Sequence, residues 1–175
     1  QDRGLTYDVV DDLTGKKLGR ASSGTFRTAD VVGLDTMAHV IKTLQDNFTE
    51  VTDPFYASYA TPEVLQALIG LGFLGQKTGA GFYKKVGRDI LRFDADSKDY
   101  VSGGQSADEV YGRMLRKPAP ERLKLLRESE GAQGQFLWAI LRNSFHYAAV
   151  HLADIADTAR DVDFAMRWGF GMKQG

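Results

Sequence analysis

The chain contains 175 residues, of which 43% are hydrophobic and 26% are charged, and its formal net charge is −1. This composition is typical of a globular protein with one domain or two small ones, and the near-neutral charge disfavours nucleic acid or a membrane surface as the partner. The absence of cysteine excludes disulfides, thiolate catalysis and cysteine-ligated metals, and no apolar run approaches the roughly 20 residues of a membrane span.

The first part of the chain is predicted to be helical. Apolar residues at helical spacing, preceded by capping residues and followed by glycine or proline, predict helices over residues 7–13, 26–32, 36–48 and 63–71. Thr6 and Asp35 are expected to cap the first and third of these helices, and Gly33 is expected to end the second.

A glycine-rich stretch follows over residues 70–81. The spacing Gly70-x-Gly72-x-x-Gly75 formally matches the dinucleotide-binding fingerprint, which requires a strand before it and a helix after it. Here a predicted helix comes first, so we interpret the glycines as a helix stop followed by a tight turn. Lys77-Thr78-Gly79 resembles one element of penicillin-binding serine enzymes, but no serine in the chain has a lysine three residues later.

The pattern then changes from helical to alternating. Residues 81–94 predict a small β-hairpin, and residues 96–105 form a polar, turn-rich segment. Helical periodicity returns and predicts helices over residues 107–115, 121–129, 135–158 and 161–168, with a break at residues 118–120. The fold class is therefore mainly α, with a helical domain of two repeat units and one small β-hairpin.

An internal repeat supports this division. Val10-Asp11-Asp12-Leu13-Thr14 aligns at a constant offset with Val162-Asp163-Phe164-Ala165-Met166. We predict a first helical unit with the hairpin over residues 1–95, a linker over 96–134, and a truncated second unit over 135–175.

The first unit is expected to lack its long N-terminal helix, and we expect the chain to be a piece of a longer protein. The missing helix would leave an apolar face exposed, formed by Val9, Val10, Leu13, Val40 and Leu44. This face would be covered by the long helix of the second unit or by another chain.

Few side chains suggest chemistry. The basic runs Lys16/Lys17/Arg20 and Lys84/Lys85/Arg88 are compatible with an anionic ligand such as a coenzyme phosphate, but a solvated face is the better explanation. The acidic pairs Asp11/Asp12, Asp94/Asp96 and Asp161/Asp163 fit helix-end electrostatics better than catalysis. His39, His146 and His151 lack the spacing of a metal pair, and Asn143 is expected on the solvent side of its helix.

Two long motifs carry a resemblance that covers almost the whole chain. The segments FRTADVVGLDT (26–36) and GFLGQKTGAGFY (72–83) closely resemble the C-terminal helical domain of 3-hydroxyacyl-CoA dehydrogenases, in the duplicated form of long fatty-acid oxidation proteins that are often fused to enoyl-CoA hydratase. The resemblance implies a parent enzyme that oxidises L-3-hydroxyacyl-CoA to 3-ketoacyl-CoA with NAD.

The resemblance also implies where the chemistry lies. In that family a His–Glu pair and a serine belong to an N-terminal NAD-binding domain, which is absent here, and an asparagine belongs to a long helix that would precede Gln1. Asn143 corresponds to that asparagine in the second copy, and no catalytic role is carried over to it. We therefore expect no catalytic, NAD-binding or metal residues in this chain, and no activity of the chain alone.

What remains implied is a scaffold. It would contact the NAD-binding domain of the same chain and the acyl-CoA substrate, with a possible homodimer and a bacterial cytoplasmic location. The residues expected in the substrate cleft or near the coenzyme A phosphates are Lys77, Thr78, Lys84, Lys85 and Arg88. The alternatives are a stand-alone helical interaction module and an acyl-CoA-binding module without catalysis.

Overall fold

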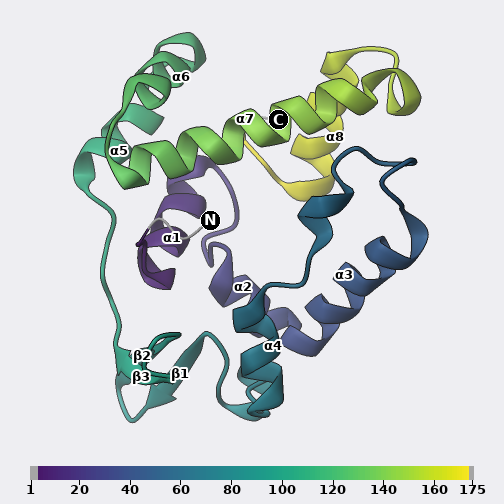
Figure 1. Ribbon diagram of the computed structural model, residues 1–175. Helices are drawn as coiled ribbons and strands as arrows, with labels where there is room; N and C mark the ends of the chain where they lie inside the picture. The colour runs from purple at the N-terminus through teal and green to yellow at the C-terminus, as the bar shows by residue number, and fades with distance from the viewer. Residues whose placement is uncertain (1–3, 174–175) are drawn as a thin grey trace. The chain divides into compact units, whose positions relative to one another are not determined.

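The computed structural model describes residues 4–173 and is mainly α-helical, as predicted (Figure 1). Its helices are α1 (Tyr7–Thr14), α2 (Phe26–Val32), α3 (Leu34–Asn47), α4 (Glu63–Gly70), α5 (Glu109–Leu115), α6 (Ala119–Glu128), α7 (Ala132–Ile155) and α8 (Ala159–Phe170). Short 3-10 helices are η1 (Lys16–Leu18), η2 (Tyr56–Tyr59) and η3 (Gln76–Thr78), and the strands are β1 (Tyr83–Val86), β2 (Asp89–Asp94) and β3 (Asp99–Ser102).

The elements form two compact units, one from residues 4–24 and 105–173 and the other from residues 25–104. The predicted division into segments 1–95, 96–134 and 135–175 concerns a sequence repeat rather than spatial contacts, and it stays a prediction.

In the unit of residues 4–24 and 105–173, α1 packs against α7. Val9 and Leu13 of α1 are buried in one cluster with Leu137 and Leu141 of α7. Figure 1 shows α5 and α6 beside the N-terminal half of α7 and α8 at its C-terminal half. This part of the predicted uncovered face is therefore covered from within the chain, whereas Val40 of α3 is exposed.

Carboxylates tie α1 to the segment that precedes α5. The Asp8 carboxylate accepts the backbone N–H of Gln105 at 2.8 Å, and the Asp12 carboxylate accepts the backbone N–H of Ala107 at 2.9 Å. Asp12 also forms an ion pair with Lys17, so its partners are an ammonium group of η1 and a backbone N–H before α5. Helix-end electrostatics is the right explanation for Asp161, which forms a capping box with Thr158 at the start of α8.

Two predicted helix starts need correction. Gly33 is the N-cap of α3, with a φ of 101°, so Asp35 lies inside the first turn and is not the cap. Helix α6 begins at Ala119, within the predicted break. Pro120 is tolerated in its first turn because a backbone N–H there would have no intrahelical partner.

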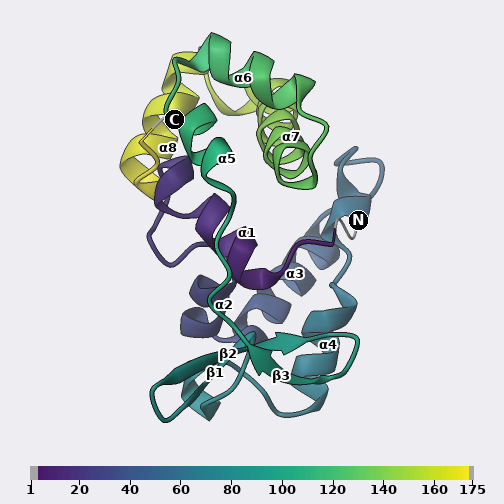
Figure 2. The same cartoon turned by 90° about the vertical axis from the view of Figure 1, so that its left-hand side faces the viewer.

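The predicted hairpin is the first part of a three-stranded antiparallel sheet in the order β1-β2-β3, which lies against α2 (Figure 2). β1 pairs with β2 through Tyr83↔Arg92, and β2 pairs with β3 through Phe93↔Tyr100. The sequence pattern missed β3 because the turn before it contains no glycine. Lys98 itself adopts a φ of 55°, a conformation that is uncommon for non-glycine residues.

Candidate functional site

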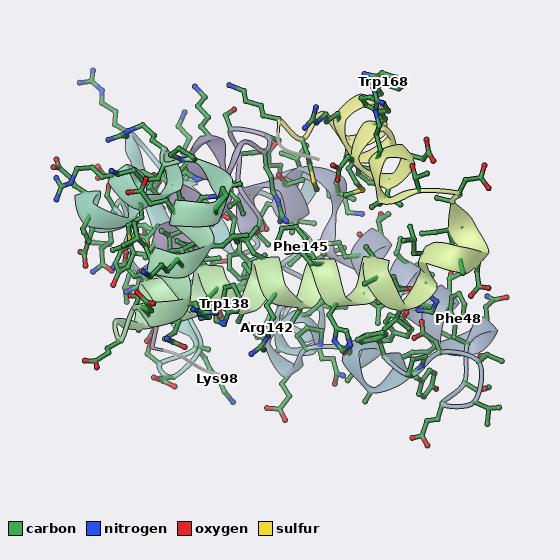
Figure 3. All side chains as sticks on the ribbon, turned by 90° about the horizontal axis from the view of Figure 1, so that it is seen from above. Phe48, Lys98, Trp138, Arg142, Phe145 and Trp168 are labelled. Atoms are coloured by element: carbon green, nitrogen blue, oxygen red, sulfur yellow. The ribbon has the colours of Figure 1, made fainter. Side chains whose placement is uncertain are left out.

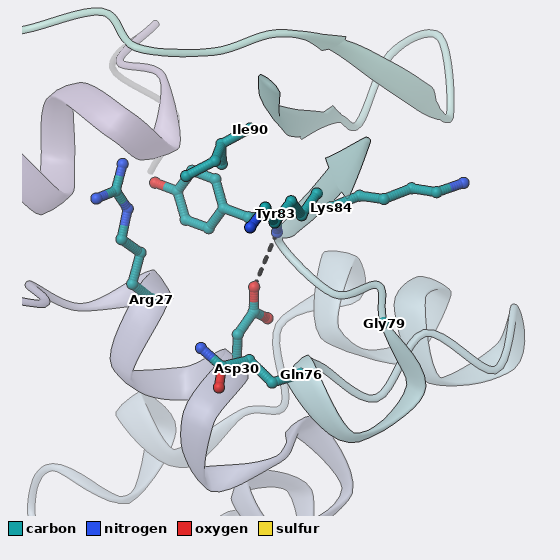
Figure 4. A pocket seen from close by; sticks show the side chains of 8 residues that line it. Arg27, Asp30, Gln76, Gly79, Tyr83, Lys84 and Ile90 are labelled. Carbon is teal, nitrogen blue, oxygen red and sulfur yellow. Dashed lines mark hydrogen bonds between the residues drawn. The ribbon is translucent and has the colours of Figure 1, made fainter. Parts of the chain in front are cut away.

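The glycine-rich stretch is wound around one carboxylate, that of Asp30 on α2. Asp30 is 4% exposed, and its two oxygens accept the backbone N–H groups of Phe82 and Tyr83 at 2.8 Å each. Figure 4 shows the hydrogen bond from the Tyr83 backbone N–H to the Asp30 carboxylate. The paired amides satisfy a charge that would otherwise be costly to bury, and they fix the start of β1 on α2.

Two glycines are required by this contact. A Cβ on Gly75, whose φ is +99°, would lie 2.3 Å from the Asp30 carbonyl oxygen, and a Cβ on Gly81 would lie 2.1 Å from Asp30 Oδ1. Both distances are far inside van der Waals contact, so only glycine fits. The interpretation of the stretch as a helix stop and turn is confirmed, because α4 ends at Gly70 and η3 and β1 follow.

Lys77 and Thr78, two of the predicted anion-binding residues, hold this loop together. The Lys77 ammonium lies 2.6 Å from both carboxylate oxygens of Asp35 on α3, and this hydrogen bond holds the pKa of Asp35 below its ordinary value. The Thr78 hydroxyl accepts the backbone N–H of Leu74 at 2.8 Å. Both side chains therefore have structural partners within the loop and the adjacent helix.

Beside the loop is a pocket of about 320 Å³, formed where α2, η3 and the first two strands meet. Its lining consists of Arg27, Asp30, Gln76, Gly79, Tyr83, Lys84, Lys85 and Ile90. The guanidinium of Arg27 lies 5.1 Å from the centre of the Tyr83 ring, within range of a cation–π contact. The pocket thus combines apolar walls with cationic groups.

Strand geometry separates the two lysines of the pocket. Side chains alternate along a strand, and Lys85 pairs with Ile90 while Tyr83 pairs with Arg92, so Lys85 shares a sheet face with Tyr83 and Ile90. Lys84 belongs to the opposite face, where its ammonium lies 5.4 Å from the centre of the Tyr100 ring. Figure 4 shows Lys84 extending away from Arg27.

The five predicted residues therefore do not form one cluster. Lys84 and Lys85 line the pocket, Lys77 and Thr78 have partners elsewhere in the loop, and Arg88 is exposed in the turn between β1 and β2. Arg27 also lines the pocket and was not predicted from the sequence. Its position one turn before Asp30 on α2 was the available signal, because residues three apart share a helix face.

Tyr100 closes the sheet onto the glycine stretch. Its hydroxyl donates to the Gly81 carbonyl oxygen at 2.6 Å. Burial, with a further contribution from the charge of Asp30, raises the pKa of Tyr100 to about 12. The phenol is therefore neutral at physiological pH and acts as a hydrogen-bond donor that fixes the loop.

The other polar residues considered from sequence lie apart from this pocket. Asn143 is exposed on α7, and its side-chain oxygen accepts hydrogen bonds from Arg142 at 3.0 and 3.1 Å. Within residues 4–173, no three histidine, aspartate or glutamate side chains are grouped so that they could hold a metal ion. No helix in the same range is long and apolar enough to cross a membrane.

Comparison with known proteins identifies the family. Residues 1–85 match the family described as 3-hydroxyacyl-CoA dehydrogenase, C-terminal domain. A Bacillus subtilis protein named as a probable 3-hydroxyacyl-CoA dehydrogenase is 35% identical over 173 residues, which is 98% of this chain and 22% of the relative. A Deinococcus radiodurans protein with the same name is 45% identical over 83 residues, covering 47% of this chain and 22% of the relative.

A third relative has a broader name. A Rickettsia felis protein whose name refers to a fatty acid oxidation complex trifunctional enzyme is 24% identical over 174 residues, covering 98% of this chain and 23% of the relative. No solved structure gives a significant match. Residues 1–85 thus match the 3-hydroxyacyl-CoA dehydrogenase C-terminal domain, as the motifs indicated, and the chain spans about a fifth of the length of the curated relatives it matches.

Proposed function

We propose that this chain is the helical C-terminal part of an NAD-dependent 3-hydroxyacyl-CoA dehydrogenase of bacterial fatty-acid oxidation, located in the cytoplasm. The reaction would convert L-3-hydroxyacyl-CoA to 3-ketoacyl-CoA. The observation that carries the proposal is the match of residues 1–85 to the C-terminal domain family, together with similarity over 98% of the chain to a relative named as this enzyme.

NAD is assigned to another domain of the same longer protein because the described residues do not fit it. A dinucleotide site needs a strand, a glycine turn and a helix whose first amides meet the pyrophosphate. Here the glycines lie between α4 and β1, and the space beside Gly75 and Gly81 is already filled by Asp30. No step of the hydride transfer is therefore assigned to residues of this chain.

The contribution proposed for this chain is to bind the coenzyme A part of the substrate. Arg27 and Lys85 lie at the pocket beside the Tyr83 ring, and a cationic group next to an aromatic face suits a nucleotide with phosphates. Lys84 on β1 and Arg88 in the turn between β1 and β2 would add longer-range attraction. Lys77 and Thr78 would act indirectly, by holding the loop that forms one wall.

Duplication and self-association belong to the same proposal. Gly19 and Gly171, which occupy matching places in the repeat, both adopt the left-handed conformation after a helical segment, with φ of 76° and 64°. On α8, Phe164 stacks on Trp168 at 4.8 Å, and Trp168 is 80% exposed. Such a surface favours a homodimer, and sedimentation that remains monomeric at high concentration would exclude it.

The test compares the chain alone with a longer protein that includes the upstream NAD-binding domain. We expect NADH formation from L-3-hydroxybutyryl-CoA by the longer protein and none by the chain alone. Absence of turnover by a folded longer protein would overturn the proposal and favour a binding module. Turnover by the chain alone would show that the assignment of the chemistry to another domain is wrong.

A further inference from the structure

A second pocket, of about 210 Å³, lies in the unit of residues 4–24 and 105–173, and the proposed dehydrogenase function does not use it. Its walls are largely apolar and consist of Leu18, Leu123, Leu141, Phe145 and Met172. Phe145, labelled in Figure 3, lies one turn after Leu141 on α7, so both side chains reach the pocket from one face of that helix. Apolar walls of this kind favour an aliphatic group inside the pocket.

Two arginines line the same pocket without adequate partners. Arg122 of α6 is 8% exposed, its Nε has no hydrogen-bond partner, and its one side-chain acceptor among the described residues is the Leu115 carbonyl oxygen, at 3.4 Å. Arg20 is half-buried, and the described residues offer its guanidinium no hydrogen bond or ion pair. Burial lowers the pKa of both groups, as expected for cations without a nearby anion.

The charge of the pocket is not balanced by the protein. Asp163 of α8 also lines it, yet no ion pair within 4 Å joins this carboxylate to either arginine in the described range. Ala119, the first residue of α6, is part of the wall, so the positive end of a helix dipole adds to the two guanidinium groups. A buried guanidinium with unsatisfied donors is costly, and an anion entering the pocket would relieve that cost.

We propose that this pocket binds a small carboxylate that carries a short aliphatic group. The guanidinium fork matches a carboxylate, the apolar walls match the aliphatic part, and two arginines against one aspartate match a monoanion better than a phosphate dianion. A volume of about 210 Å³ restricts the ligand to a few carbon atoms beyond the carboxylate. The proposal stands independently of the dehydrogenase assignment, because the first pocket and its residues do not contribute to it.

The direct test is a titration of the whole chain with hexanoate, followed through the 13C-labelled methyl groups of its methionines. Met172 lines the pocket and should shift in a saturable manner, whereas Met37 of α3 serves as an internal control. Hexanamide has the same shape as hexanoate but no charge. Acetate and inorganic phosphate are charged but lack the longer aliphatic group. We expect each of these to bind at least about tenfold more weakly than hexanoate.

Variants then assign the binding to the arginines. Arg20→Gln should weaken the binding of hexanoate about tenfold or more. Arg20→Lys should weaken it less, because the positive charge is kept while the guanidinium fork is lost. Arg113→Gln, at an exposed position of α5 that does not line the pocket, is the matched control and should bind hexanoate as the unmodified chain does. Arg20 is only half-buried, so these variants are expected to fold even if Arg122 variants do not.

Three results would overturn the proposal. They are the absence of a saturable Met172 shift with hexanoate, equal binding of hexanamide or phosphate, and unchanged affinity of a folded Arg20→Gln variant.

Discussion

Gly81 lies so close to Asp30 that a Cβ added to Gly81 would be 2.1 Å from the Asp30 carboxylate oxygen Oδ1. The glycine stretch therefore packs directly on the aspartate. The Asp30 carboxylate of α2 accepts hydrogen bonds from the two backbone N–H groups at the start of β1. The glycines that looked like a nucleotide fingerprint are explained by this contact.

Removing the carboxylate should destabilise the fold. Asp30→Ala leaves the amides of Phe82 and Tyr83 without their acceptors, and we expect a loss of about 2 to 4 kcal/mol in the free energy of unfolding. Urea denaturation measures the effect. Asp46→Ala is the control, since Asp46 forms an exposed ion pair with Lys42 and should cost about 0.5 kcal/mol or less. Equal effects of the two changes would contradict the role of Asp30.

The glycine positions can be tested separately. Gly81→Ala places a methyl group against Asp30 and should destabilise the chain by about 3 kcal/mol. Gly70→Ala, at the end of α4, meets no atom within 4 Å and should be neutral or stabilising by up to about 1 kcal/mol. Thermal unfolding of both variants measures the difference, and a tolerated Gly81→Ala would show that the loop does not close on Asp30.

The Tyr100 phenol should titrate late. With its pKa raised to about 12, Tyr100 is protonated in the fold when an unfolded tyrosine, with a pKa of about 10, has ionised. Its contribution to stability is therefore full below about pH 10 and is lost as the pH rises through about 12. In an ultraviolet titration of tyrosinate, the chain should show one more ionising tyrosine than the Tyr100→Phe variant, at the most alkaline end of the curve. If the two curves differ near pH 10 instead, the pKa of Tyr100 is not raised by burial.

The same variant has a second effect at neutral pH. Tyr100→Phe removes the hydrogen bond to the Gly81 carbonyl and should cost about 1 kcal/mol in the free energy of unfolding.

The ion pair between Lys77 and Asp35 predicts a loss of stability in acid. The pKa of Asp35 is lowered in the fold, so the contribution of the carboxylate is present above its unfolded pKa of about 3.9 and is lost as the pH falls through the lowered value. The stability difference between the chain and Asp35→Asn should therefore shrink below about pH 4. A difference independent of pH would mean that the ion pair does not hold the loop.

In the longer enzyme, Arg27→Gln and Lys85→Gln should raise the KM for acyl-CoA several-fold without changing kcat, because they would remove contacts to parts of the substrate that do not react. The N-acetylcysteamine thioester, which lacks the coenzyme phosphates, should show no such change. Lys42→Gln on α3 is the control. A fall in kcat for the thioester would indicate a disturbed fold rather than lost phosphate contacts.

Much of the fold follows from local pattern. The helices, the glycine turn and the first two strands were predictable because capping residues, periodicity and the steric freedom of glycine act over a few residues. The family was also recognisable from two motifs, and comparison with known proteins confirms it. The third strand was missed because Lys98 adopts a positive φ at a turn where glycine is expected. The start of α6 was missed because Pro120, which usually indicates a break, lies in the first turn of the helix.

Sequence alone thus determined the helical class, the turn at the glycines and the family resemblance. Only the tertiary structure decided that Asp30 meets Phe82, 52 residues away, that Lys84 and Lys85 belong to opposite faces of the sheet beside Arg27, and that Arg20 and Arg122 line one pocket. The physical reason is that local periodicity specifies which face of an element is apolar, whereas the identity of the partner on that face depends on how distant segments pack.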